Sequence, residues 1–148
     1  MKAPFLLGRA ILGGFFLYNG ILHFTEKDSH VQYAAMKNIP VPGLAVHATG
    51  AVLAFGGASL ILGLKPKWGT MALIGFLGSA AATMHDFWNA EDPQQKQNDT
   101  INFAKNIALA GATLALAGVE EPWPASVAND NRNRFDKLRE FGKRRVAA

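Results

Sequence analysis

Four long apolar blocks divide the chain up to residue 119, and charged residues collect between them. The blocks span residues 4–22, 44–64, 68–87 and 101–119. Crossing a hydrocarbon core about 30 Å thick takes about 20 helical residues. Inside a bilayer the backbone must satisfy its own hydrogen bonds, which blocks of this length do as helices. The pattern therefore predicts an all-α integral membrane protein built as a four-helix bundle.

The first block raises the question of a signal peptide. Signal peptides carry a cation before their apolar region, and Lys2 precedes this block. The residues that follow, LHFTE at 22–26, offer no small-residue cleavage site. We therefore expect the first block to remain as a membrane span.

Lys and Arg are distributed unequally between the two ends of the predicted spans. With four spans, the N-terminus, residues 65–67 and residues 120–148 lie on one side of the membrane. The cations on that side are Lys2, Arg9, Lys65, Lys67, Arg132, Arg134, Lys137, Arg139, Lys143, Arg144 and Arg145, whereas the opposite side has Lys27, Lys37, Lys96 and Lys105. Because cytoplasmic flanks carry the Lys/Arg excess, we expect both termini in the cytoplasm.

This orientation collects polar residues at the outer ends of the spans. His23 ends the first span, His47 opens the second, and His85 and Asp86 close the third. Polar residues at membrane depth usually face the protein interior, so we predict a polar pocket there. Its expected residues are Lys105, Asp86, His85, His23, His47, Asn19 and Asn106. Arg9, at the inner end of the first span, is the eighth candidate for ligand binding, and its guanidinium either faces the bundle interior or extends to the headgroups.

Lys105 stands where the uncharged part of the last block begins, between Asn102 and Asn106. Its ammonium either extends to the lipid headgroups or faces inward, where it pairs with Asp86 or a ligand oxygen. The two asparagines favour polar surroundings, and we expect the inward orientation, close to Asp86 and His85.

The histidines also raise the possibility of a metal site, for which His23, His47 and His85 are the candidates. No HxxxH or HxH pair occurs, so ligation would require side chains from three helices, and we predict no metal. The alternatives are a hydrogen bond to a quinone carbonyl, proton transfer, or an ordinary interfacial histidine, above all for His30.

Small residues recur at helical spacing within the blocks and predict close helix packing. The pairs and triplets are Gly13 and Gly20, Gly50 and Gly57, Gly75 with Ser79 and Thr83, and Ala104 with Ala108 and Ala112. Bulky aromatic residues near the block ends (Trp68, Phe87, Trp88 and Trp123) are expected at the membrane interface.

Composition narrows the function classes. The chain has no cysteine, which excludes thiol redox chemistry and thiolate metal sites. Half of its net charge of +4 comes from the 29-residue tail. The tail lacks the alternating aromatic and basic residues of single-strand binders, so we expect no nucleic-acid partner. No nucleophile–base pair, phosphate loop or cofactor motif assigns catalysis to this chain alone.

The last 29 residues differ from the rest in being polar and basic, and we divide the chain into a membrane domain, 1–119, and a cytoplasmic tail, 120–148. Phe135, Leu138 and Phe141 occur among several Arg and Lys. The tail either forms an amphipathic helix on anionic lipid or on a partner, or stays a solvated basic extension.

Several short motifs, in order and spacing, resemble the DoxX family. They are Arg9 with Gly13, Phe16 and Gly20; Gly56-Gly57 followed by LILGLK at 60–65; HDFW at 85–88; the glutamines of residues 94–97; and FAKNI at 103–107 with Gly111. The resemblance runs from residue 2 to about residue 119. Many relatives carry a Glu shortly before the paired glycines, where this chain has Leu53.

The resemblance implies a multi-pass, four-helix protein of the bacterial inner membrane. Some DoxX members are associated with thiosulfate:quinone oxidoreductase, and others partner sulfurtransferase-type or superoxide-handling proteins. We therefore expect a small subunit of a redox-linked membrane system, with an outer-leaflet pocket for a quinone or another small molecule. Its partners would be the lipid bilayer and other membrane or membrane-associated redox proteins.

The alternative is a purely structural or accessory subunit of a larger membrane complex. A small transporter is a weaker hypothesis, since the sequence has neither an internal repeat nor a discontinuous helix.

Overall fold

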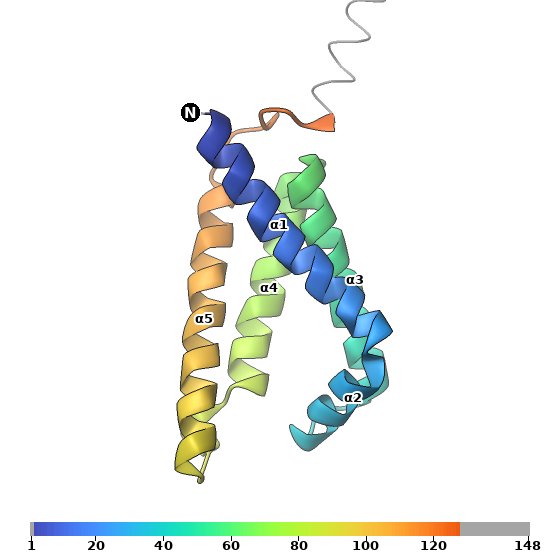
Figure 1. Ribbon diagram of the computed structural model, residues 1–148, viewed down its shortest axis with the longest axis vertical. Helices are drawn as coiled ribbons and strands as arrows, with labels where there is room; N and C mark the ends of the chain where they lie inside the picture. Colours follow the sequence, from blue (N-terminus) through green and yellow to red (C-terminus); the bar gives the residue numbers. More distant parts are fainter. Residues whose placement is uncertain (1, 128–148) are drawn as a thin grey trace, which may run out of the picture.

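The computed structural model describes residues 2–127, and this part of the chain is helical (Figure 1). Its elements are α1 Lys2–Thr25, α2 Lys27–Met36, α3 Pro42–Leu62, α4 Pro66–Met84, the 3-10 turn η1 Phe87–Asn89, and α5 Pro93–Ala117. The predicted amphipathic segment of the tail, with Phe135, Leu138 and Phe141, lies outside the described residues.

The four long helices α1, α3, α4 and α5 correspond to the four apolar blocks. α1 packs against α3, α3 against α4, and α4 against α5. In Figure 1, the start of α1 and the end of α5 lie at the top, and α2 lies at the bottom. We call these the Arg9 end and the α2 end.

Helix α2 lies where the hydropathy pattern predicts only a loop between the first two blocks. Its ten residues are KDSHVQYAAM, and Asp28 in the first turn complements the helix dipole. Ala34 is the residue of α2 that is buried. The periodicity signal was weak because this helix buries so little of its surface, and it depends on its packing against α1 and α3.

Helix α5 begins at Pro93, two turns before the predicted start at residue 101. Asp92 caps it, since its carboxylate accepts a 2.7 Å hydrogen bond from the Gln95 backbone N–H. The polar first turns extend beyond the apolar block, which is why hydropathy alone placed the start too late.

Glycines bring α1 and α3 into close contact. The Gly13 and Gly57 backbones meet, and Gly20 lies against the Ala54 backbone, so a Cβ at either of these α1 glycines would collide with α3. The small-residue packing predicted for the last two blocks is wrong in detail. Gly75 has open space beside it, and the residues Ser79, Thr83, Ala104, Ala108 and Ala112 are exposed.

The hydrophobic core lies between the long helices and reaches the Arg9 end. Its buried members are Phe16, Leu53, Leu60, Leu73, Leu77 and Trp123. The expectation that Trp123 lies at the membrane interface is therefore wrong, because its side chain is fully buried and meets Phe5 edge-on with ring centroids 5.3 Å apart. The packed part of the chain thus continues beyond residue 119.

Two of the described helices are long and apolar enough to cross a membrane, Ala3–Thr25 and Pro42–Leu62. Large apolar side chains are also exposed on the outer faces of α1, α4 and α5. Examples are Ile11 (64% exposed), Met71 (60%) and Leu114 (61%).

Candidate functional site

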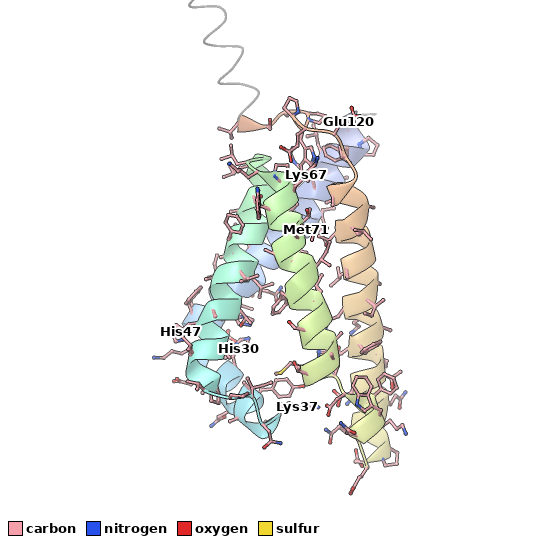
Figure 2. All side chains as sticks on the ribbon, turned by 180° about the vertical axis from the view of Figure 1, so that it is seen from behind. His30, Lys37, His47, Lys67, Met71 and Glu120 are labelled. Atoms are coloured by element: carbon pink, nitrogen blue, oxygen red, sulfur yellow. The ribbon has the colours of Figure 1, made fainter. Side chains whose placement is uncertain are left out.

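A cavity of about 330 Å³ opens near the α2 end, between α1, α2, α3, α4 and α5. Its walls are mostly apolar and include the aromatic rings of Phe15, Phe16 and Phe76. Figure 2 shows His30 and Lys37 at this end of the molecule, while Lys67 and Glu120 lie at the other.

Two histidines from neighbouring helices stack in the wall of this cavity. The rings of His23 on α1 and His30 on α2 have centroids 4.4 Å apart. His23 Nδ1 lies 2.8 Å from the Asn19 carbonyl oxygen, and His30 Nδ1 lies 2.9 Å from that of Glu26. Because a carbonyl oxygen only accepts hydrogen bonds, each Nδ1 carries the proton. In the neutral rings both Nε2 atoms are then acceptors.

A cluster of three charged side chains lies beside the cavity. Lys37 Nζ, just after α2, is 2.8 Å from Asp86 Oδ1 and 3.1 Å from Asp99 Oδ2 on α5. His85 Nδ1 lies 3.4 Å from Asp99 Oδ1. The Asp99 side chain is only 7% exposed, so its charge depends on these partners.

The contacts within this charged cluster also shift the pKa values of Lys37 and Asp86. Burial by itself lowers the pKa of Lys37, but the hydrogen bonds to Asp86 and Asp99 outweigh it and raise that pKa above its usual value. The pKa of Asp86 is lowered, first by the hydrogen bond from Lys37 and then by the one from Asn89. Lys37 and Asp86 therefore both remain charged across the physiological pH range.

Four of the eight candidate residues line the cavity: Asn19, His23, His85 and Asn106. Asp86 lies in the adjoining charged cluster. The position expected for Lys105 is wrong, because its side chain is exposed and Lys37 is the cation that pairs with Asp86. His47 is also exposed, on the outer side of α3 against Phe24.

Arg9 is buried at the end of the molecule opposite the cavity, and it does not line the cavity. Its guanidinium donates to the carbonyl oxygens of Pro124 (3.0 Å), Ala125 (3.1 Å) and Ile61 (3.3 Å). The last of these belongs to the C-terminal turn of α3, where unpaired carbonyls favour a cation. Arg9 thus joins α1 to α3 and to the segment after α5.

Sequence reasoning missed four residues of the site. The sequence pattern indicates an ordinary interfacial residue for His30, and it does not single out Tyr33, Lys37 or Asp99. The available signal was Asp99, a carboxylate two residues before an apolar block. Once α5 is extended to Pro93, Asp99 falls inside a helix, and a buried carboxylate requires a cation.

No group of three or more His, Asp or Glu side chains within residues 2–127 is arranged to hold a metal ion. The three metal candidates do not converge, since His47 is exposed on the outside of α3, whereas His23 and His85 line the cavity.

The DoxX family model matches residues 5–86, more than half of the chain. The chain belongs to the DoxX family. No curated protein and no solved structure matches it. The family match together with the two candidate spans indicates a membrane protein.

The DoxX match covers α1 to α4 and ends at Asp86. Most of the cavity wall, including His23 and His30, falls inside it, whereas Asp99 and Asn106 on α5 fall outside. Leu53 is 2% exposed and lines the cavity. In this chain that part of the wall is apolar.

Proposed function

We propose that this DoxX protein is a four-span subunit of a redox-linked system in the bacterial inner membrane, whose cavity binds a quinone or a similar lipid-soluble small molecule. The observation that carries the proposal is the cavity itself, about 330 Å³, with apolar walls and a histidine pair on one side. Small-molecule sites typically combine such walls with a few placed polar groups.

Helices α4 and α5 would cross the membrane with α1 and α3. α4 has 19 residues, which gives a length of about 28 Å, close to the hydrocarbon thickness. Exposed apolar residues such as Met71 on α4 and Leu114 on α5 suit contact with lipid. With both termini cytoplasmic, the cavity would lie toward the outer leaflet.

The charged cluster has a supporting role in this proposal. Lys37 follows α2 and ties it to Asp86 and Asp99, while Tyr33 of α2 donates to the Met84 carbonyl oxygen over 3.3 Å. These contacts hold α2 across the gap between α3 and α4. Helix α2 thereby forms a wall of the cavity that the four long helices do not supply.

Purification in mild detergent, followed by solvent extraction and mass spectrometry, tests the proposal. We expect a lipid-soluble aromatic compound to accompany the wild-type protein and to be lost from Ala80→Phe, which fills the cavity. Ala82→Phe is the matched control, because Ala82 is an exposed neighbour that is not part of the cavity wall.

If a stoichiometric protein complex is recovered without any such compound, the chain is a structural or accessory subunit, and the ligand-binding proposal is wrong.

A further inference from the structure

The hydroxyl donors of the cavity wall are already used within the protein. Thr49 donates to the Ala45 carbonyl oxygen (2.8 Å), Ser79 to that of Phe76 (2.9 Å), and Thr83 to that of Ser79 (2.8 Å). The Tyr33 hydroxyl donates to the Met84 carbonyl oxygen. These oxygens therefore present lone pairs, not protons, to a ligand.

The histidines of the wall add further acceptors. In His23 and His30 the Nδ1 proton is bound to a backbone carbonyl oxygen, and in His85 Nδ1 lies 3.4 Å from Asp99. In the neutral rings each Nε2 then carries a lone pair. The donors that remain in the wall are on the Asn19 and Asn106 side chains, and Asn19 already donates to the Phe15 carbonyl oxygen over 2.8 Å.

From this imbalance we infer that the cavity selects a neutral aromatic ligand that donates hydrogen bonds, namely a phenol or the reduced, hydroquinone form of a quinone. The inference rests on the proposed function, because it names the ligand class of the same cavity. Hydroxyl groups of such a ligand would donate to Nε2 of His23 and His30, while the ring packs among the phenylalanines.

Two other ligand types fit less well. An oxidised quinone offers only carbonyl acceptors, which would face the acceptors of the histidine pair without a proton between them. An organic cation would satisfy the acceptors, but Asp86 and Asp99 do not line the cavity and are paired with Lys37. Its charge would then be buried without a counter-ion.

Three probes of nearly equal shape separate these possibilities. They are tetramethyl-1,4-hydroquinone, tetramethyl-1,4-benzoquinone and 1,4-dimethoxytetramethylbenzene. The hydroquinone offers two hydrogen-bond donors, whereas the other two probes offer none. Binding to the full chain in lipid nanodiscs is measured by anaerobic equilibrium dialysis at pH 8, with empty nanodiscs subtracted. We expect the hydroquinone to bind at least about tenfold more tightly than either other probe, as two hydrogen bonds would give.

Histidine variants identify the acceptors. His23→Phe and His30→Phe keep a ring but remove Nε2, and each should reduce the preference for the hydroquinone at least about threefold. His47→Phe is the matched control, because His47 lies outside the cavity, and it should retain the preference. The comparison of probes on the wild-type protein does not depend on the folding of any variant.

The outcomes separate the inference from the proposed function. Equal binding of all three probes, or tighter binding of the quinone, overturns the donor preference and leaves a cavity that binds by shape. If none of the three probes binds, both the preference and the proposed ligand-binding function are wrong.

Discussion

Lys37 and Asp86 are 49 positions apart in the sequence, yet their charged atoms lie 2.8 Å apart at the edge of the cavity. Lys37 follows α2 and Asp86 follows α4, so this contact joins two helices that are not adjacent in the chain. Through its second bond, to Asp99, the same ammonium also holds α5. One side chain thus connects the two sides of the cavity.

We predict that Lys37→Met destabilises the protein by about 1–3 kcal/mol, because Asp99 is left buried with its main cationic partner removed. The measurement is thermal or denaturant unfolding in detergent. Lys105→Met is the matched control, since Lys105 is exposed and should change stability little. Similar losses for both variants would contradict the assigned role of Lys37.

The double variant Lys37→Met/Asp99→Asn sharpens this test. Removing the buried negative charge together with its cation should restore part of the stability lost in Lys37→Met. If the two losses simply add, Asp99 does not depend on Lys37.

The pKa shifts predict a broad plateau of stability against pH. The raised pKa of Lys37 means that its contribution is complete below the unfolded value, about 10.4, and is lost as pH rises through the folded value. The lowered pKa of Asp86 means that its contribution is complete above about 3.9 and is lost as pH falls through the folded value.

We therefore measure the free energy of unfolding of wild type and of Lys37→Met from pH 3 to pH 11. The difference between the two proteins should be largest between about pH 4 and about pH 10. A difference that stays constant over the whole range would show that the charges do not contribute.

We predict that Arg9→Met releases the segment after α5 and destabilises the protein by about 3 kcal/mol, because three backbone carbonyls lose their charged donor. Trp123 reports this locally when Trp68 and Trp88, both exposed, are replaced by Phe. Its emission should shift to longer wavelength in Arg9→Met but not in the control Lys67→Met. An unchanged emission would mean that Trp123 stays buried without Arg9.

The proposed orientation can be tested with single cysteines, because the chain has none of its own. Glu91 and Lys67 are exposed, one after η1 at the α2 end and the other at the start of α4. A membrane-impermeant maleimide added to intact spheroplasts should label Glu91→Cys, and should label Lys67→Cys only after lysis. The reverse pattern would place both termini outside.

The long helices were predictable because each contains a continuous apolar block, which is recognised from the sequence without knowledge of the helices that pack against it. The close approach of α1 and α3 was also predictable, since Gly13 and Gly20 recur on one face of α1. In contrast, α2 could not be recognised. Its sequence is short and polar, and tertiary contacts stabilise it more than its own pattern does.

The candidate site was predicted in part. Asn19, His23, His85 and Asn106 lie around one cavity because the helix ends fix their depth. The choice of cation failed, because the position of α2, which the sequence pattern does not predict, is what brings Lys37 to Asp86 and Asp99. Ion pairs between residues 49 or 62 positions apart depend on how each helix is rotated about its own axis. A single sequence does not specify that rotation.

The bonds of Arg9 also set an order of events during synthesis. Two of its three acceptors, at Pro124 and Ala125, lie 115 and 116 positions downstream, so the ribosome makes them on the order of ten seconds after Arg9 itself. Until then the Arg9 guanidinium lacks two of its three final acceptors. Over that time water or other polar groups must satisfy the cation, because an unpaired buried charge is costly. The contacts that close the Arg9 end can therefore form only after residue 125 has been made.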